Sequence, residues 1–501
     1  MNDLQRSQGK RGLTLFCRLL MILSPFLLLA IVSLAAGHNA FAALPVWSDE
    51  LDTWRSLFNW NAVGFSTGYS GMYEALPSVG SLGVTGVTPI LLYGWFVKLF
   101  GLSESTIVIA NAVWIALAAL VFCWLVKPKG STALMLTGLL TLYVPISLYC
   151  VTSMTELFSY ALMLFYLAFL CSYYRKRKPL MLALCVLTML FACVYRGAYA
   201  VLLIPLALVY GDMKLGLKTI LAAVVSLALV LLCYYLTSLI TAPSVLKFTY
   251  HFLRAESLGD MWKMLMGHGK ANLMDYLAST GSVMQNAFRL LYCGVAALCL
   301  LGSFVRVERA SRKARVRFGF ETELFCCFGL LFVALVFVCA FFETGDWVDF
   351  RLLSPFLWLV LGFLALRRKV VIPLAALAAC LVTTVMLLTL PAEGAFVDEY
   401  RFEAQPDNEK LTVAAQHIPY DASATNPLTN TVRTDLSGMQ VQRELAAGLG
   451  LQTGWFSTDT TGKSNWILTD QLKCVVEGYK EVYTEPKISV YKLIKSYEVE
   501  P

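Results

Sequence analysis

The residues best suited to chemistry are two adjacent carboxylates, Asp49 and Glu50, in the sequence Trp47-Ser48-Asp49-Glu50. They follow the first long apolar stretch closely, so both carboxylates are expected at a membrane surface. A lipid-linked substrate would present its polar head at that depth, where a carboxylate can act as a general base. Ser and Asp are also preferred at the start of a helix. The pair is therefore either catalytic or the beginning of a helix.

The composition places the chain in a membrane. Of its 501 residues, 58% are hydrophobic and 15% are charged, whereas soluble proteins rarely exceed about half apolar residues. The net charge of +7 does not indicate a nucleic-acid partner, because Lys and Arg cluster at the ends of apolar stretches, where orientation explains them. The expected fold class is an α-helical polytopic membrane protein.

Eleven membrane spans are predicted, at residues 14–36, 105–126, 131–150, 156–173, 179–194, 197–211, 217–240, 284–304, 322–342, 352–366 and 370–390. With the N-terminus inside, every strongly basic loop lies in the cytoplasm, as the positive-inside bias requires. No Asn-x-Ser/Thr acceptor and no retention signal is present, which favours a bacterial plasma (inner) membrane over an endoplasmic reticulum.

One short apolar segment, residues 88–100, decides this topology. It contains Pro89 and Lys98, and counting it as a span would place the basic run 175–178 outside. We therefore predict a juxtamembrane helix at the interface, where Trp95 and Lys98 are well suited. This helix belongs to an outer loop, 37–104, and loops of such length are usually functional.

The tail has ordinary soluble composition. Val441, Leu445 and Leu449 recur at helical spacing, while Trp466–Thr469 and Ile488–Leu493 resemble strands. We predict two domains, a transmembrane catalytic domain over 1–390 and a small extracytoplasmic α/β domain over 391–501.

On this topology, several charged residues near the span ends converge on the outer face. They are Asp49, Glu50, Glu156, Arg196, Asp346, Asp349 and Arg351.

The order of these motifs resembles the GT-C superfamily of polyprenyl-phosphate-sugar-dependent glycosyltransferases, which includes protein O-mannosyltransferases and the aminoarabinose transferases of lipid A. The residues that match its motifs are Asp49-Glu50, Thr88-Pro89-Ile90-Leu91, Leu99-Phe100-Gly101, Glu156 and Arg351-Leu352-Leu353-Ser354-Pro355. Two departures leave the subfamily open, because Glu156 stands where Asp is common and Thr88 replaces the first Pro of a Pro-Pro pair.

The resemblance implies an inverting hexosyl- or pentosyltransferase that moves a sugar from a polyprenyl-phosphate donor to a glycan, lipid or protein acceptor at the extracytoplasmic face. The donor already carries a good leaving group, so the protein must deprotonate the acceptor, align the anomeric carbon and neutralise the phosphate. The resemblance makes Asp49 the base, with Glu50 and Glu156 orienting it or holding the sugar. Arg351 and Arg196 are expected at the phosphate, because guanidinium donates two parallel hydrogen bonds.

Two further acidic residues are expected to contact substrate, namely Asp349 beside Arg351 and Glu74 in the long outer loop. Some relatives hold a divalent metal ion, for which Glu74 is a candidate ligand. The sequence itself assigns no metal ion or other cofactor, because no Cys/His cluster has metal-ligand spacing.

Simpler structural explanations exist for these charges. Glu156 suits the N-terminus of a helix, Arg196 suits a position at the lipid headgroups, and Arg351 suits an ion pair with Asp346 or Asp349. Among other functions, a transporter or flippase, a saccharide polymerase or a non-catalytic assembly subunit remain open. Transporters place charges near the bilayer midplane, whereas the predicted span centres here are nearly free of charge.

Overall fold

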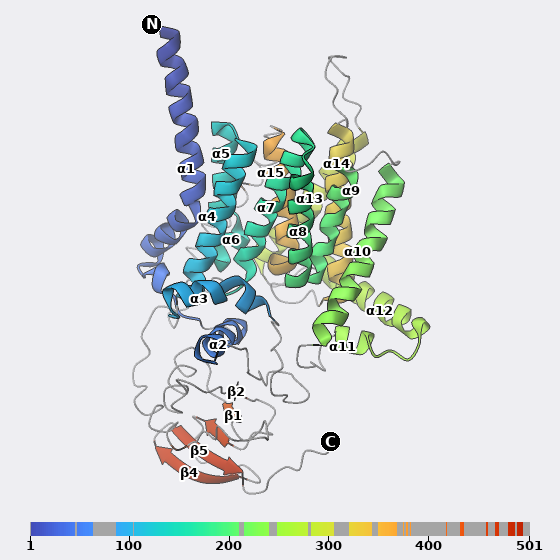
Figure 1. Ribbon diagram of the computed structural model, residues 1–501. Coiled ribbons are helices and arrows are strands. Elements are labelled where there is room, and N and C mark those ends of the chain that lie inside the picture. The colour runs from blue at the N-terminus through green and yellow to red at the C-terminus, as the bar shows by residue number, and fades with distance from the viewer. Residues whose placement is uncertain are drawn as a thin grey trace.

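The computed structural model is mostly helical, with a small sheet near the C-terminus (Figure 1). It describes residues 2–45, 48–63, 87–103, 105–209, 215–239, 248–278, 282–304, 320–342 and 349–367, and positions 374, 377–378, 381 and 417. It also describes the strand segments 431–434, 457–458, 466–469, 479–485 and 488–493.

Five helices of this described part are long and apolar enough to cross a membrane. They are α1 (Asn2–Ala36), α4 (Thr106–Val126), α7 (Glu156–Lys176), α13 (Val283–Phe304) and α14 (Phe320–Phe341). α4 and α7 end at Lys127 and Arg177, which both have left-handed backbone with φ of 51°. A proline follows within two residues in each case, and neither helix continues through it.

Further apolar helices complete the bundle. They are α5 (Gly130–Thr141), α6 (Val144–Tyr149), α8 (Pro179–Tyr195), η3 (Gly197–Leu202), α9 (Leu203–Val209), α10 (Leu215–Ser238) and α15 (Ser354–Leu366). The predicted span 131–150 is interrupted, because Pro145 has no N–H to donate to the Thr141 carbonyl. Ser147 Oγ donates to that carbonyl instead, at 3.0 Å. The predicted span 370–390 lies almost entirely outside the described residues, so the count of eleven spans stays a prediction.

Packing and internal hydrogen bonds hold the bundle together, since hydrocarbon surroundings provide no hydrophobic drive between helices. Phe158 of α7 makes edge-to-face contacts with Trp114 and Tyr195, with ring centroids 5.2 and 5.8 Å apart. The fully buried Trp358 of α15 donates its indole N–H to the Leu139 carbonyl of α5, at 3.1 Å. These contacts fix the helices that carry the charged residues.

A layer of short elements crosses the lower end of the bundle, opposite the N-terminus (Figure 1). It contains α2 (Ser48–Val63), η2 (Ile90–Gly94), α3 (Trp95–Phe100), α11 (Phe248–Phe252) and α12 (Leu258–Leu277). α2 and η2 approach so closely that a Cβ on Gly94 would lie 2.8 Å from Trp60 Nε1. The predicted interfacial segment 88–100 forms the apolar helical stretch Ile90–Phe100, which is shorter than a membrane span and lies across the bundle end.

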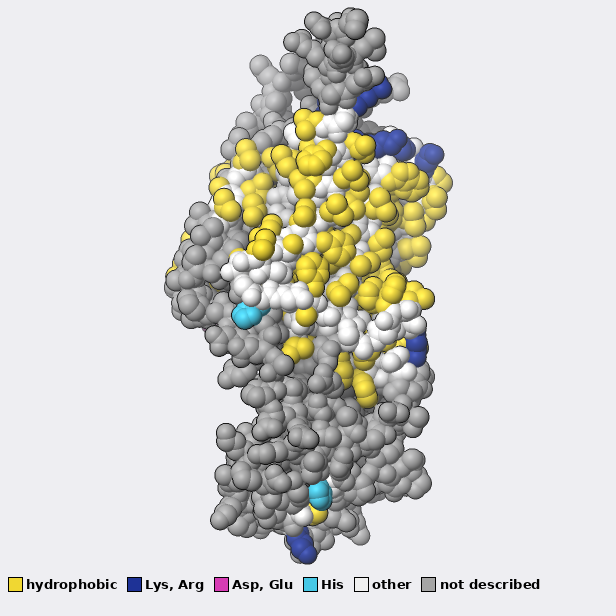
Figure 2. Space-filling view, turned by 90° about the vertical axis from the view of Figure 1, so that its left-hand side faces the viewer, with side chains coloured by type: hydrophobic (Ala, Val, Ile, Leu, Met, Phe, Trp, Pro, Cys, Tyr) yellow, Lys and Arg dark blue, Asp and Glu magenta, His cyan; other side chains and the backbone are white. Residues whose placement is uncertain are grey.

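The outer surface of the bundle is apolar over its middle. Figure 2 shows hydrophobic side chains across one face, with Lys and Arg side chains gathered near its upper end. This distribution matches a protein surrounded by hydrocarbon and bordered by headgroups.

Five strands form one mixed sheet in the order β2-β1-β3-β5-β4. They are β1 (Thr431–Thr434), β2 (Ser457–Thr458), β3 (Trp466–Thr469), β4 (Tyr479–Glu485) and β5 (Ile488–Leu493). Both strands predicted from the sequence are present with the predicted bounds, and they pair antiparallel, with Ile467 opposite Tyr491. The helical pattern at Val441, Leu445 and Leu449 lies outside the described residues.

Candidate functional site

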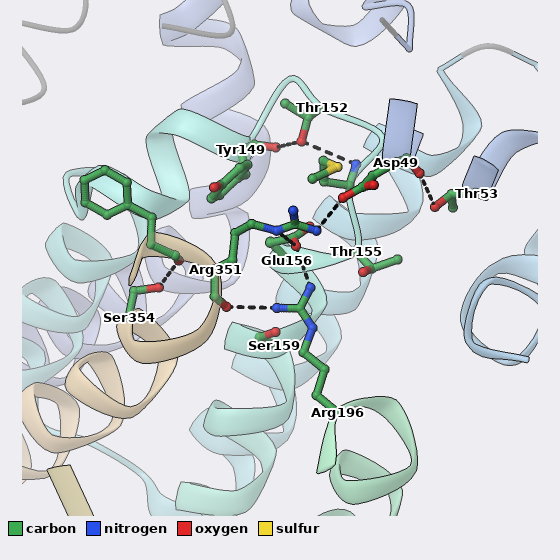
Figure 3. Close-up of polar contacts among 12 residues, drawn as sticks. Asp49, Thr53, Tyr149, Thr152, Thr155, Glu156, Ser159, Arg196, Arg351 and Ser354 are labelled. Carbon is green, nitrogen blue, oxygen red and sulfur yellow. Dashed lines mark hydrogen bonds and ion pairs between the residues drawn. The ribbon is translucent and has the colours of Figure 1, made fainter. Parts of the chain in front are cut away.

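Four charged side chains form a continuous chain of ion pairs at the lower end of the bundle (Figure 3). Arg351 Nη2 lies 2.7 Å from Asp49 Oδ2, and Arg351 Nε lies 2.7 Å from Glu156 Oε1. Arg196 Nη2 contacts the same Glu156 oxygen at 2.5 Å. The order is therefore Asp49, Arg351, Glu156, Arg196, with alternating charge and a net charge of zero.

Asp49 and Arg351 are more exposed than Glu156 and Arg196. The Asp49 side chain is 47% exposed and that of Arg351 is 32% exposed, whereas Arg196 is 14% exposed and Glu156 is 2% exposed. Asp49 and Arg351 can meet a substrate from outside, and Glu156 and Arg196 form a buried support beneath them. Glu156 Oε2 is buried without a hydrogen-bond partner among the described residues, which is uncommon in a packed interior.

Asp49 is placed by the first turn of α2, which begins at Ser48 as the sequence pattern allows. Thr53 Oγ1 donates to the Asp49 carbonyl at 2.8 Å and fixes this turn. The carboxylate remains free to project toward Arg351. The two explanations of the Asp-Glu pair are therefore compatible, because the residues begin a helix and one of them joins the charged site.

Glu50 is fully buried. Its Oε1 accepts a hydrogen bond from the Ser153 backbone N–H at 2.5 Å. Asn111 Nδ2 donates to the Met154 carbonyl at 2.8 Å in the same loop. Because this loop leads directly into Glu156, the geometry favours a positioning role for Glu50.

Glu50→Leu is expected to lower the free energy of unfolding by about 1–3 kcal/mol, because the buried Ser153 N–H loses its acceptor. Glu50→Gln keeps a carbonyl oxygen at that place and is expected to lose clearly less. Thermal unfolding of both variants in detergent measures this difference. Equal losses in the two variants would show that the hydrogen bond to Ser153 is not what Glu50 supplies.

Arg351 is placed by a π-helical turn, η4 (Asp349–Leu353), at the entrance to α15. Ser354 Oγ donates to the Phe350 carbonyl, while Tyr143 Oη donates to the Ser354 carbonyl at 2.9 Å. Tyr160 Oη lies 2.6 Å from Ser354 Oγ. π-helical turns are rare in proteins, but those that occur are often found at functional sites. This turn is held by Tyr143 and Tyr160, which both contact Ser354.

Arg196 occupies the turn between α8 and η3, where its backbone is extended. Its Nη1 donates to the Arg351 carbonyl at 2.9 Å, and its guanidinium lies over the Tyr195 ring. Burial lowers the pKa of this guanidinium, but the nearby Tyr195 and Glu156 raise it by more than burial lowers it. The net effect is a pKa above the ordinary value for arginine. Arg196 is therefore a permanent cation that binds Glu156 and η4 together.

Three acidic residues singled out in the sequence are not placed by the structure. Glu74 and Asp346 lie outside the described residues, and the side chain of Asp349 does too. Within the described part of the chain, no group of three His, Cys, Asp or Glu residues is arranged to hold a metal ion. The residues that the structure brings together are Asp49, Glu156, Arg196 and Arg351.

Several residues that support the site were not predicted from the sequence. Asn111 is fully buried in α4, where its Oδ1 accepts from Tyr93 Oη at 2.7 Å and its amide holds the Met154 carbonyl. Tyr195 Oη donates to the Thr155 carbonyl at 2.7 Å. A lone Asn inside an apolar span was the available signal, because such residues usually serve a purpose.

No protein-family model matches the sequence, and no curated protein matches it. The structure is similar to the archaeal oligosaccharyltransferase AglB from Archaeoglobus fulgidus, solved with an inhibitory peptide and a dolichol-phosphate. The TM-score is 0.39 and the identity 11%, over 89% of this chain and 69% of AglB. ArnT from Cupriavidus metallidurans is similar in its apo state, with TM-score 0.37, and bound to undecaprenyl phosphate, with TM-score 0.36. Both ArnT comparisons give 13% identity over 93% of this chain and 97% of ArnT.

AglB and ArnT are GT-C glycosyltransferases, the superfamily that the motif order of this sequence resembles. The apolar helices of the chain itself make it a multi-pass helical membrane protein.

Proposed function

We propose that this protein is an inverting glycosyltransferase that moves a sugar from a polyprenyl-phosphate donor to an acceptor hydroxyl or amine. One observation carries the proposal, which is the linked chain from Asp49 through Arg351 to Glu156 and Arg196 at one end of the bundle. It combines a partly exposed carboxylate with a partly exposed guanidinium on a rigid buried support. The chemistry requires a base beside a phosphate-binding cation, and these two side chains provide both.

Arg351 is the group proposed to bind the donor phosphate. Its Nε and one Nη2 hydrogen hold Glu156 and Asp49, while Nη1 has no partner among the described residues. A phosphate that meets this side of the guanidinium competes with Asp49 for it. Donor binding therefore loosens Asp49 from Arg351 and leaves its carboxylate free to meet the acceptor proton.

Charge conservation supports the same assignment. During transfer, the acceptor oxygen or nitrogen bonds to the anomeric carbon as the bond from that carbon to the phosphate oxygen breaks. The acceptor proton moves to Asp49, and the leaving phosphate keeps the electron pair and gains one negative charge. Protonation of Asp49 changes the net charge of the four-residue chain from zero to +1, which compensates the new charge on the phosphate.

Glu156 and Arg196 are proposed to position Arg351 rather than to react. Glu156 is almost completely buried, and its Oε1 is shared by both guanidiniums. A carboxylate buried in this way does not reach an acceptor that approaches from outside. Of the two roles expected for Glu156, orienting the site or holding the sugar, we propose the orienting one, and Asp49 is left as the base.

The proposed architecture has a catalytic transmembrane domain over 1–390 and a small extracytoplasmic domain over 391–501. α2, whose first turn carries Asp49, and the sheet lie toward the same end of the bundle in Figure 1, and α1 begins at the opposite end. With basic loops inside, the N-terminus is cytoplasmic and the site faces the outside of a plasma membrane.

Arg351 variants test the phosphate assignment, with undecaprenyl phosphate as the probe in detergent. Arg351→Gln is expected to weaken binding about tenfold or more, because a charge-assisted pair of hydrogen bonds is lost. Arg351→Lys keeps the charge but loses the fork, so we expect an intermediate affinity. Lys263→Gln, which changes an exposed cation on α12, is the control and leaves binding unchanged. Equal affinity for undecaprenyl phosphate in the unsubstituted protein and all three variants would contradict the assignment of Arg351 to the phosphate.

Consumption of an undecaprenyl-phosphate-linked sugar tests the reaction itself. The expected result is release of undecaprenyl phosphate together with a glycosylated acceptor. A lipid-linked sugar that only changes leaflet, with its phosphate bond intact, would instead identify a flippase.

A further inference from the structure

A cavity of about 240 Å³ lies at the end of the bundle away from the charged site. α7, α9, α14 and α15 line it. α7 rises about 1.5 Å per residue, so Glu156 at its start and Arg175 near its end lie roughly 28 Å apart. The cavity is therefore separate from the site proposed for sugar transfer.

The inner wall of the cavity is apolar. Leu167 and Leu170 of α7 face it from one side, and Leu330 of α14 and Val360 and Phe363 of α15 from the others. Apolar cavities of this kind do not hold ordered water, because water would find no polar partners there. The interior suits a hydrocarbon chain.

The rim of the cavity is polar and cationic. Arg367 Nε donates to Glu323 Oε2 at 2.8 Å, and Arg175 Nη1 donates to the Val126 carbonyl at 2.9 Å. Arg175 is exposed, while the Arg367 side chain is 35% exposed. Two guanidiniums and one carboxylate give the rim a net charge of +1. Lys176 and Lys178, next along the chain, add charge of the same sign nearby.

We propose that this cavity binds an anionic glycerophospholipid, with one acyl chain inside and the phosphate at Arg175 and Arg367. Basic pockets between membrane helices on the side with basic loops are known to take anionic headgroups. A free phosphate would leave the apolar volume unfilled. A polyprenyl donor engaged at Arg351 has its phosphate at the far end of α7.

The bound lipid would brace the two helices that carry the site. α7 begins with Glu156, and α15 follows η4, the turn that carries Arg351. A lipid held between the far ends of α7 and α15 restrains their relative movement, so it stabilises the fold without touching the charged residues.

Titration of the full chain in detergent tests the proposal, with phosphatidylglycerol and phosphatidylcholine of identical acyl chains as probes. Native mass spectrometry counts the retained lipid, and thermal unfolding measures the stabilisation. Tighter retention of phosphatidylglycerol is expected. Equal retention of both lipids, or retention of undecaprenyl phosphate alone, would overturn the proposal.

Charge variants should move the affinity in opposite directions. Arg175→Gln is expected to weaken phosphatidylglycerol binding about fivefold, and Glu323→Gln to strengthen it by a similar factor, as one unit of charge near an anionic lipid implies. Lys129→Gln changes a basic residue at the same end but outside the cavity, and leaves the affinity unchanged. If Glu323→Gln leaves the affinity for phosphatidylglycerol unchanged or lowers it, the assignment of the rim as the phosphate site is overturned.

A filling variant tests the cavity itself. Cys326 of α14 lines the cavity, whereas Val336 of the same helix is 45% exposed. Cys326→Phe is expected to reduce the number of retained phosphatidylglycerol molecules by one, and Val336→Phe to leave it unchanged. The same retention in both variants would show that the acyl chain does not enter this cavity.

Discussion

Asp49→Asn is expected to slow sugar transfer by a factor of about 100–10,000, the usual contribution of a positioned general base. The amide keeps the shape of the carboxylate and can still accept a hydrogen bond from Arg351. It cannot take the acceptor proton, and it leaves the new negative charge on the phosphate without compensation. The loss should appear in kcat, because the acceptor proton moves only in the transition state.

The Asp49→Asn variant should bind undecaprenyl phosphate more tightly, although it transfers sugar more slowly. Asp49 and the phosphate compete for Arg351, so removal of the Asp49 charge is expected to strengthen binding of the phosphate. The fold should be little affected, because ion pairs of such partly exposed side chains contribute about 0–1 kcal/mol. A variant that binds the lipid phosphate more tightly and transfers no sugar would separate a catalytic role from a structural one.

Asp260→Asn provides the matched control. Asp260 is an exposed carboxylate in the first turn of α12, at the same end of the bundle as Asp49. Its loss should leave transfer and phosphate binding unchanged. Unchanged turnover in a folded Asp49→Asn protein would eliminate Asp49 as the base.

The sequence was sufficient to select the charged residues of the site, but not to pair them. Residue type, topology and motif order picked out Asp49, Glu156, Arg196 and Arg351. The pairs join residues up to 302 positions apart, and such contacts depend on helix packing that no local pattern encodes. Arg351 pairs with Asp49 and Glu156. The sequence suggested Asp346 or Asp349 as its partner, and both of those side chains lie outside the described residues.

Local patterns predicted the elements well where they were regular. Strands β3 and β5 have their predicted bounds because β-branched and aromatic residues dominate both. The interruption of the span 131–150 at Pro145 was missed, because a long apolar window averages over a single proline. That interruption matters for the site, since it places Tyr143 where its hydroxyl holds Ser354 beside η4.

Glu156→Gln is expected to lower the free energy of unfolding by about 3–5 kcal/mol, the usual cost of removing one partner from a buried ion pair. Arg196 and Arg351 would then face each other with only Asp49 to offset two positive charges. Thermal unfolding in detergent measures the loss. Lys263→Gln, which breaks an exposed pair with Asp260, should change stability by less than about 1 kcal/mol.

A second substitution distinguishes lost charge from lost shape. Glu156→Gln combined with Arg196→Gln removes the unneutralised cation, so the double variant should be more stable than Glu156→Gln alone. Glu156→Asp keeps the charge on a shorter side chain and should retain part of the stability. Additive losses in the double variant would mean that Glu156 and Arg196 do not act as a pair. Transfer should remain low in the double variant, because Arg351 has lost the buried carboxylate that orients it toward the donor phosphate.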